Sequence, residues 1–134
     1  MAFHTITLVG NLGSDAKLQY NQNGQPYVRF SVVTNRKKRN EAGEMVEYTT
    51  WFNVAKTGPI AETLTPYLVK GTRVAVLGKL CPDKVSGHPK VFENSKGVMD
   101  SSYEVMAQEI VLLNKPAEKP AASHYDDEDY DEVF

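Results

Sequence analysis

The feature that most constrains the fold of this chain is the alternation of apolar and polar residues along most of its length. The alternation is clear in four stretches: Ile6 and Leu8; Val28, Phe30 and Val32; Val74 and Val76; and Ile110 and Leu112. A period of two residues is typical of strands that bury one face. We therefore predict five strands, at residues 3–12, 27–35, 47–57, 72–80 and 103–113, with turn sequences at Asn23-Gly24 and Ala42-Gly43.

One segment between the third and fourth predicted strands has helical spacing instead. Its apolar residues recur every four positions, at Ile60, Leu64 and Leu68. Pro59 suits the first turn and Gly71 suits the stop, whereas Pro66 should distort the last turn or end the helix early. The order of elements predicts an all-β fold, a five-stranded OB-fold barrel whose one short helix caps an open end. An SH3-like barrel offers no obvious place for that helix.

Two further segments lack regular patterning. From Cys81 to Ser102 only Lys90–Glu93 looks extended, so we expect a long mobile hairpin arm. Residues 114–123 have nothing to bury and resemble a linker. The 134 residues suit one domain plus a tail. We therefore predict an OB-fold domain at 1–115 and a flexible linker with a disordered acidic tail at 116–134.

Charge is divided unevenly between these two parts. Residues 1–115 hold 14 Lys and Arg against 10 Asp and Glu, a net charge of +4. Residues 116–134 hold one Lys and seven acids, a net charge of −6. A mildly basic body with a strongly acidic tail indicates a polyanion-binding surface and a separate interaction segment.

Other patterns argue against an enzyme, a metal site and a bound cofactor. The chain has no Gly-x-Gly, no phosphate-binding loop ending in Gly-Lys-Ser/Thr and no Gly-x-Ser-x-Gly. Cys81 is the only cysteine, and the three histidines form no closely spaced zinc-ligand set with it. No apolar run could span a bilayer and residues 1–5 do not resemble a secretion signal, so we expect no membrane association and a cytoplasmic location.

Four basic residues, Arg36, Lys37, Lys38 and Arg39, follow the second predicted strand directly. We expect them at the tip of a hairpin loop, where cations can follow nucleic-acid phosphates. Charge runs are often no more than solvated loops. The aromatic strand that follows favours the functional interpretation.

That strand places Trp51, Asn53 and Ala55 on one face and Phe52 and Val54 on the other. Phe52 and Val54 suit the core. Polar neighbours on its own face argue against burial of Trp51, and an exposed indole can stack on a base for about 1–3 kcal/mol. We take Trp51, Asn53 and, at the end of the strand, Lys56 as candidate nucleic-acid-binding residues.

Weaker candidates lie on the second strand and in the arm. Tyr27 and Arg29 share the face opposite Val28, Phe30 and Val32, so they could extend the platform or form an ordinary sheet face or a subunit contact. In the arm, Phe92 is a stacking candidate beside Lys84 and Lys90, with packing inside the arm as the alternative.

The tail combines an acidic run with an apolar end, and its candidate partner-binding residues are Asp129, Asp131, Glu132, Val133 and Phe134. Acidic termini commonly act as solubilising spacers. A terminal Phe beside a free carboxylate instead suits a pocket with an apolar floor and a basic rim. The tail could also compete with DNA for the basic body.

Several segments, in this order, resemble bacterial-type single-stranded-DNA-binding proteins: Thr7–Asp15, Phe30–Asn35, Thr50–Val54, Ala61-Glu62, Tyr67–Gly71 and Val76–Leu80. The resemblance implies an OB fold, a homotetramer, wrapping of single-stranded DNA and a tail tip that docks on replication, recombination and repair proteins. It also implies a base-stacking role for Trp51. The host could be a bacterium or a phage, which places the protein in the bacterial or host cytoplasm, or an organelle.

The chain departs from that family at aromatic positions. The family often has Trp where this chain has Lys38 and near Val85, and Phe where this chain has Thr57. Loss of stacking groups should shift affinity toward phosphate contacts, so we predict unusually salt-sensitive binding. The tail also lacks the proline often found before the final residue, so partner preference could differ.

Three functions remain open at this point. The first is sequence-independent coating of single-stranded DNA, with no covalent step. The second is an RNA-binding OB module, which differs in whether the 2′-hydroxyl is accepted. The third is an adaptor whose barrel binds protein and whose tail is the main interaction site.

Overall fold

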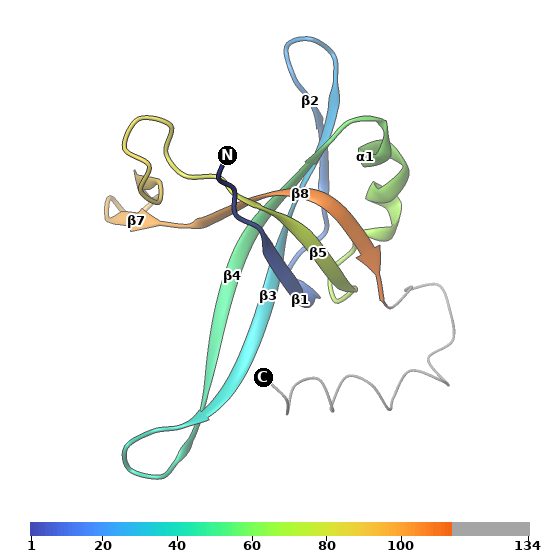
Figure 1. The fold of residues 1–134 in the computed structure, drawn as a ribbon. Coiled ribbons are helices and arrows are strands. Elements are labelled where there is room, and N and C mark those ends of the chain that lie inside the picture. Colours follow the sequence, from blue (N-terminus) through green and yellow to red (C-terminus); the bar gives the residue numbers. More distant parts are fainter. Residues whose placement is uncertain (114–134) are drawn as a thin grey trace, which may run out of the picture.

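The computed structural model describes residues 1–113, and Figure 1 shows their strands wrapped into a barrel with a helix beside it. The strands are β1 (Ile6–Leu12), β2 (Lys17–Tyr20), β3 (Pro26–Arg39), β4 (Met45–Thr57), β5 (Arg73–Leu80), β6 (Val91–Glu93), β7 (Met99–Ser101) and β8 (Tyr103–Leu112). The helices are α1 (Pro59–Leu64) and the single 3-10 turn η1 (Thr65–Tyr67). The predicted linker and acidic tail lie outside the described residues, so the division at 115/116 stays a prediction.

Five of the strands close the barrel. β1 pairs with β5, β5 with β8, β8 with β4 and β4 with β3. β3 returns to β1 through the pairs Asn11–Val33 and Leu12–Val32. The β4–β8 pairing is parallel, and the other four are antiparallel. This is the OB barrel predicted from the order of elements, with its helix between the third and fourth barrel strands.

The core of the barrel contains most of the alternating residues that predicted the strands, and Ile6, Ile110 and Leu112 pack against it while partly buried. The buried apolar side chains are Leu8, Leu12, Val28, Phe30, Val32, Val54, Ala61, Leu68, Val74, Val76, Val105 and Ala107. Every second residue of β3 from Val28 to Val32 points inward, which leaves the intervening residues on the outer surface. The barrel therefore presents a continuous outer face on β3 and β4.

β2 was not among the predicted strands. β2 pairs with the start of β3, from Lys17–Arg29 to Tyr20–Pro26, beyond the point where β1 leaves β3. Only Leu18 of its four residues packs against the core. A single inward residue gives no alternation to detect, so the sequence carried too weak a signal for this strand.

The prediction that the basic run lies in a hairpin loop was wrong. β3 continues to Arg39, which pairs with Met45 of β4, and only residues 40–44 form the turn. Figure 1 shows this two-stranded ribbon projecting well beyond the barrel. Its residues keep strand pairing although both faces are in solvent, so no apolar alternation marks them. Gly43 supplies the turn's positive φ of 81°.

The helix begins at Pro59 and ends early, as Pro66 predicted: α1 stops at Leu64, and Pro66 lies in η1. Ile60 does not share the inward face, however, and is 45% exposed. Ala61 is buried in its place, together with Leu68. Ala61, Leu64 and Leu68 follow a spacing of three and then four, so the inward side of this segment is centred on Ala61 rather than on Ile60.

The arm between β5 and β8 is a hairpin, as predicted. Its strands β6 and β7 pair through Val91–Ser101, Phe92–Asp100 and Glu93–Met99 and form a separate two-stranded sheet. The extended segment expected at Lys90–Glu93 corresponds to β6. Figure 1 shows this hairpin as a second projection, on a different side of the barrel from the β3–β4 ribbon.

Candidate nucleic-acid interface

The outer face of β3 and β4 collects the strongest candidates in one surface, which we call the Trp51 face. Its cross-strand pairs are Val33–Trp51, Ser31–Asn53 and Arg29–Ala55. These residues alternate with core residues of the same strands, so the pleat directs them away from the barrel interior. The predicted sharing of one face by Trp51, Asn53 and Ala55 is confirmed.

Trp51 itself is 54% exposed, which confirms the predicted outward orientation. The indole is also supported from one side, because a Cβ atom built on Gly13 would overlap its Cζ3 and lie 2.9 Å from its Cη2. The same Cβ would lie 3.0 Å from Cγ2 of Val33. The absence of a side chain at Gly13 thus allows the indole ring to pack against the backbone there. Gly13 was not among the candidates selected from the sequence.

The basic run is divided between the two faces of the β3–β4 ribbon. Lys37 and Arg39 share the Trp51 face, where Lys37 pairs across the strands with Glu47. Nη1 of Arg39 donates to the carbonyl oxygen of Gly43 at 2.9 Å. Arg36 and Lys38 lie on the opposite face by the alternation of the strand. A loop tip would have allowed the four cations to form one cluster. In the ribbon they are instead divided between its two faces.

The opposite face of the ribbon carries an aromatic residue that was not selected. Tyr48 is 50% exposed and pairs across the strands with Arg36. Within the described ribbon, this face holds no acidic residue between positions 34 and 38 or 46 and 50. The predicted strand at 47–57 already contained Tyr48, and strand geometry counted back from Trp51 places Tyr48 on the opposite face.

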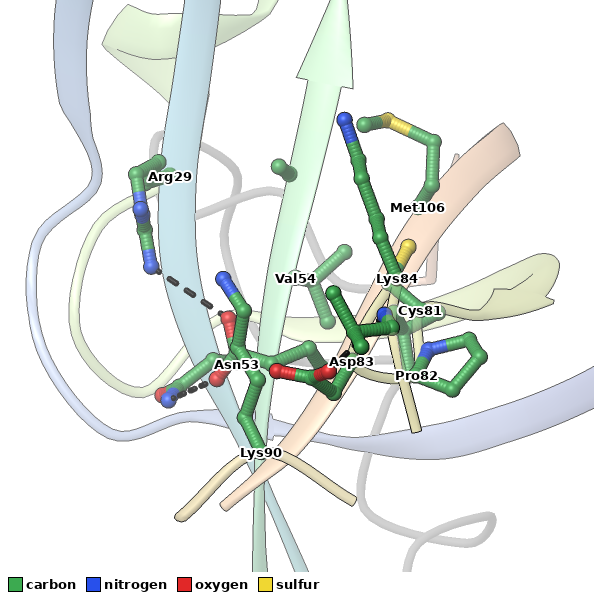
Figure 2. A pocket seen from close by; sticks show the side chains of 13 residues that line it. Arg29, Asn53, Val54, Cys81, Pro82, Asp83, Lys84, Lys90 and Met106 are labelled. Atoms are coloured by element: carbon green, nitrogen blue, oxygen red, sulfur yellow. Dashed lines mark hydrogen bonds and ion pairs between the residues drawn. The ribbon is translucent and has the colours of Figure 1, made fainter. Parts of the chain in front are cut away.

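A groove borders the Trp51 face where the barrel meets the β5–β8 arm. Its volume is about 520 Å³, and Figure 2 shows its lining residues, with Arg29 and Asn53 on one side and Lys84 and Lys90 from the arm. The other labelled residues are Val54, Cys81, Pro82, Asp83 and Met106. Four of the predicted binding residues are therefore brought together: Arg29, Asn53, Lys84 and Lys90.

A carboxylate, Glu104 of β8, links two of these residues. Its Oε2 accepts hydrogen bonds from Asn53 Nδ2 at 2.8 Å and from Ser102 Oγ at 2.7 Å. Its Oε1 pairs with Nη2 of Arg29 at 3.5 Å. The dashed lines in Figure 2 mark the contacts with Arg29 and Asn53. Sequence reasoning missed Glu104, because only the parallel β4–β8 pairing places it opposite Asn53.

Besides Trp51 and the basic run, three more of the predicted residues lie outside the groove lining. Lys56 projects from the face opposite Trp51, and its Nζ donates to the carbonyl oxygen of Gln108 at 2.9 Å. Tyr27 is half-buried at the far end of β3, opposite Thr57. Phe92 is 43% exposed on β6. The structure therefore does not bring Lys56 next to Trp51, Asn53 or the arm lysines.

The arm is held at its base by Asp83. Hydrogen bonds from the backbone N–H of Ser86, at 3.0 Å, and of Val85, at 2.9 Å, lower the pKa of this carboxyl below its ordinary value. The nearby charge of Lys90 lowers the pKa further. Asp83 also lines the groove. The position of Lys84 beside the groove thus depends on a turn that an ionised carboxylate stabilises.

Among the described residues, no three His, Cys, Asp or Glu side chains gather in a way that could hold a metal ion. The helices of residues 1–113 include none that is long and apolar enough to cross a membrane.

A family model described as the single-strand binding protein family matches residues 3–113, which is most of the chain. The chain belongs to this family. A relative named single-stranded DNA-binding protein, from Neisseria meningitidis serogroup B, is 28% identical over 127 residues, covering 95% of this chain and 69% of its own length. The resemblance noted in the sequence is thereby confirmed.

Solved structures agree on the fold. A small single-stranded DNA-binding protein from Streptomyces coelicolor superposes with a TM-score of 0.66 at 22% identity, covering 84% of this chain and 95% of its own. A Plasmodium falciparum protein of the same family, solved in complex with single-stranded DNA, gives a TM-score of 0.65 at 22% identity, with coverage of 85% and 97%. At this identity the likeness shows the fold alone.

Proposed function

We propose that this protein binds single-stranded DNA largely without regard to sequence, and that binding itself is its activity. The observation that carries the proposal is the half-exposed Trp51, supported by Gly13 on the outer face of the barrel. An exposed indole among polar neighbours does not contribute to the hydrophobic core, but its flat face can stack on any base. Membership of the single-strand binding protein family supports the same function.

The cations around Trp51 suit the backbone of the bound strand. Lys37 and Arg39 lie farther out on the same face, and Lys84 and Lys90 border the groove on its other side. A strand that stacks on Trp51 can therefore place phosphates near cations in both directions. This chain has fewer aromatic residues than the family often has at these positions. Phosphate contacts should therefore supply a large share of its affinity for DNA.

In the cell, the proposed role is to coat and protect exposed DNA during replication, recombination and repair. The acidic tail, with Asp129, Asp131, Glu132, Val133 and Phe134, would recruit partner proteins of these processes. Its chemistry suits a pocket with a basic rim and an apolar floor. The location that this role requires is the cytoplasm of a bacterium or of a phage host.

We also propose assembly into a homotetramer, supported by two features of the barrel. Val9, Ala75 and Val111 line up across the outer face of β1, β5 and β8, and the adjoining Leu77 is 37% exposed. In addition, β1 pairs with β3 only through Asn11 and Leu12, so among the described strands one edge of Ile6–Gly10 has no partner. An apolar sheet face and an open edge are surfaces that subunit contacts cover.

The test is equilibrium binding of fluorescently labelled oligothymidine to the full chain and to Trp51→Ala. The variant should keep its fold, since Trp51 is exposed, and lose the affinity of one stacked base, about 1–3 kcal/mol. Tyr67→Ala is the matched control, because Tyr67 is 47% exposed on η1, away from this face. Equal loss in both variants would refute the stacking role, and no binding by the wild type would refute the function.

The same assay separates the alternatives. An RNA-binding module predicts that a matched RNA oligomer competes at least as well as DNA, because the 2′-hydroxyl would be accepted. An adaptor predicts that neither oligomer binds and that deletion of residues 116–134 changes nothing in the titration. The exposed indole and the groove cations favour the DNA-binding proposal over the adaptor.

A further inference from the structure

Glu104 places a negative charge on the surface proposed to bind a polyanion. It lies opposite Asn53 in the β4–β8 pairing, and its side chain is 22% exposed beside the groove. A carboxylate repels phosphate, so it does not contribute to backbone binding at this point. A ligand group that donates hydrogen bonds suits this point instead.

The hydrogen bonds of Glu104 leave room for such a donor. Oε2 already accepts from Asn53 and Ser102 at short distances. Within residues 1–113, the contact of Oε1 is with Arg29 at 3.5 Å, which is long for a charged hydrogen bond. Because an ionised carboxylate offers about four acceptor positions, Oε1 retains capacity for a further donor.

The groove beside Glu104 suits a flat ring. Val54, Ala55, Met106 and Pro82 supply apolar lining, and the volume is about 520 Å³. Arg29, Asn53 and Glu104 converge on one side of the groove, and Asp83, Lys84 and Lys90 line it from the arm. The combination of apolar walls with a few converging polar groups is that of a binding pocket for a ring-shaped ligand.

We propose that this groove receives one base of the bound strand and that Glu104 makes it prefer cytosine to thymine. The proposal rests on the proposed DNA-binding function. Cytosine offers its 4-amino group to Oε1, as carboxylates accept from cytosine N4 elsewhere. Its N3 and O2 can then accept from Arg29. Thymine presents a carbonyl oxygen, O4, in place of the amino group, and the carboxylate repels it.

The experiment compares affinities for oligodeoxycytidine and oligothymidine of equal length, for the full chain and for Glu104→Gln. The amide introduced by this substitution keeps the shape and most hydrogen bonds of the carboxylate, but it has no charge and can donate to O4. We expect the ratio of cytidine to thymidine affinity to fall by about three- to tenfold in the variant, the value of one hydrogen bond to a partly exposed charged group. Glu109→Gln is the control, because Glu109 is exposed on β8 outside the groove lining.

A second probe needs no variant. An oligonucleotide with 2-pyrimidinone in place of cytosine lacks only the 4-amino group, so the wild type should bind it more weakly than oligodeoxycytidine. Equal binding of the two would overturn the inference. A uniform rise in affinity for all oligomers in Glu104→Gln would also overturn it, since that result assigns Glu104 a purely repulsive effect. In both cases the proposed function would stand, whereas absence of binding to every oligomer would refute that function itself.

Discussion

Gly13 and Trp51 are in direct contact: the space that a side chain at Gly13 would fill is occupied by the six-membered ring of Trp51. The ring is thereby held against the barrel on one side while 54% of the residue stays exposed. An aromatic residue held in this way loses little conformational freedom when a base stacks on it. The contact therefore connects the loop after β1 with the proposed binding activity.

Gly13→Ala should displace the indole and weaken binding. The new methyl group would overlap Cζ3, so the ring must shift. We expect altered emission of the free protein, since Trp51 is its only tryptophan, and a loss of oligothymidine affinity no larger than that of Trp51→Ala. In a double-mutant cycle, Gly13→Ala should have little further effect once Trp51 is Ala. Additive losses in the cycle would show that Gly13 acts independently of the ring.

Removal of Lys37 and Arg39 together should lower the salt dependence of binding. On a plot of the logarithm of the binding constant against the logarithm of the salt concentration, each phosphate neutralised on a single strand contributes roughly −0.7 to the slope. If Lys37 and Arg39 each neutralise one phosphate, the slope should become less steep by about 1.4 in the double variant. The measurement is oligothymidine affinity over a series of salt concentrations. Lys56→Ala serves as control, because Lys56 faces away from Trp51 and bonds to Gln108. A slope equally reduced by the control would contradict the assignment of faces.

Leu77→Asp should disrupt the proposed tetramer. Leu77 adjoins the row of Val9, Ala75 and Val111 and points away from the core. A charge there would be buried without a partner in the assembly but solvated in a free subunit. Mass measurement of the native protein should give four chains for the wild type and fewer for the variant. A wild-type mass of one chain would rule out the tetramer.

Acid should loosen the base of the β5–β8 arm through Asp83. Because its folded pKa is lowered, the turn is fully stabilised at pH values above the unfolded pKa, about 3.9, and loses this support as pH falls through the lower folded value. The backbone N–H groups of Val85 and Ser86 should then exchange faster with solvent. NMR titration of the Asp83 carboxyl should give a midpoint below about 3.9, and a midpoint at or above it would contradict this role.

The sequence predicted the barrel because one face of each barrel strand is buried, and this constraint leaves the alternation at Val28, Phe30 and Val32. The ribbon beyond the barrel carries no such constraint, so the extension of β3 to Arg39 was missed. Exposure of Trp51 followed from the same alternation. The groove did not, because it depends on the parallel pairing of Asn53 with Glu104 and on the fold of the arm. Contacts between residues about 50 positions apart leave no local pattern.

Stacking of the Trp51 ring on bases of single-stranded DNA is the interaction on which the proposed function depends. The most direct test is titration of the full-length protein with oligothymidine while the intrinsic tryptophan fluorescence is recorded, since Trp51 is the only tryptophan in the chain. Stacking predicts strong, saturable quenching that parallels binding measured independently with labelled DNA. Binding that leaves the emission of Trp51 unchanged would show that the ring does not stack on the bound bases.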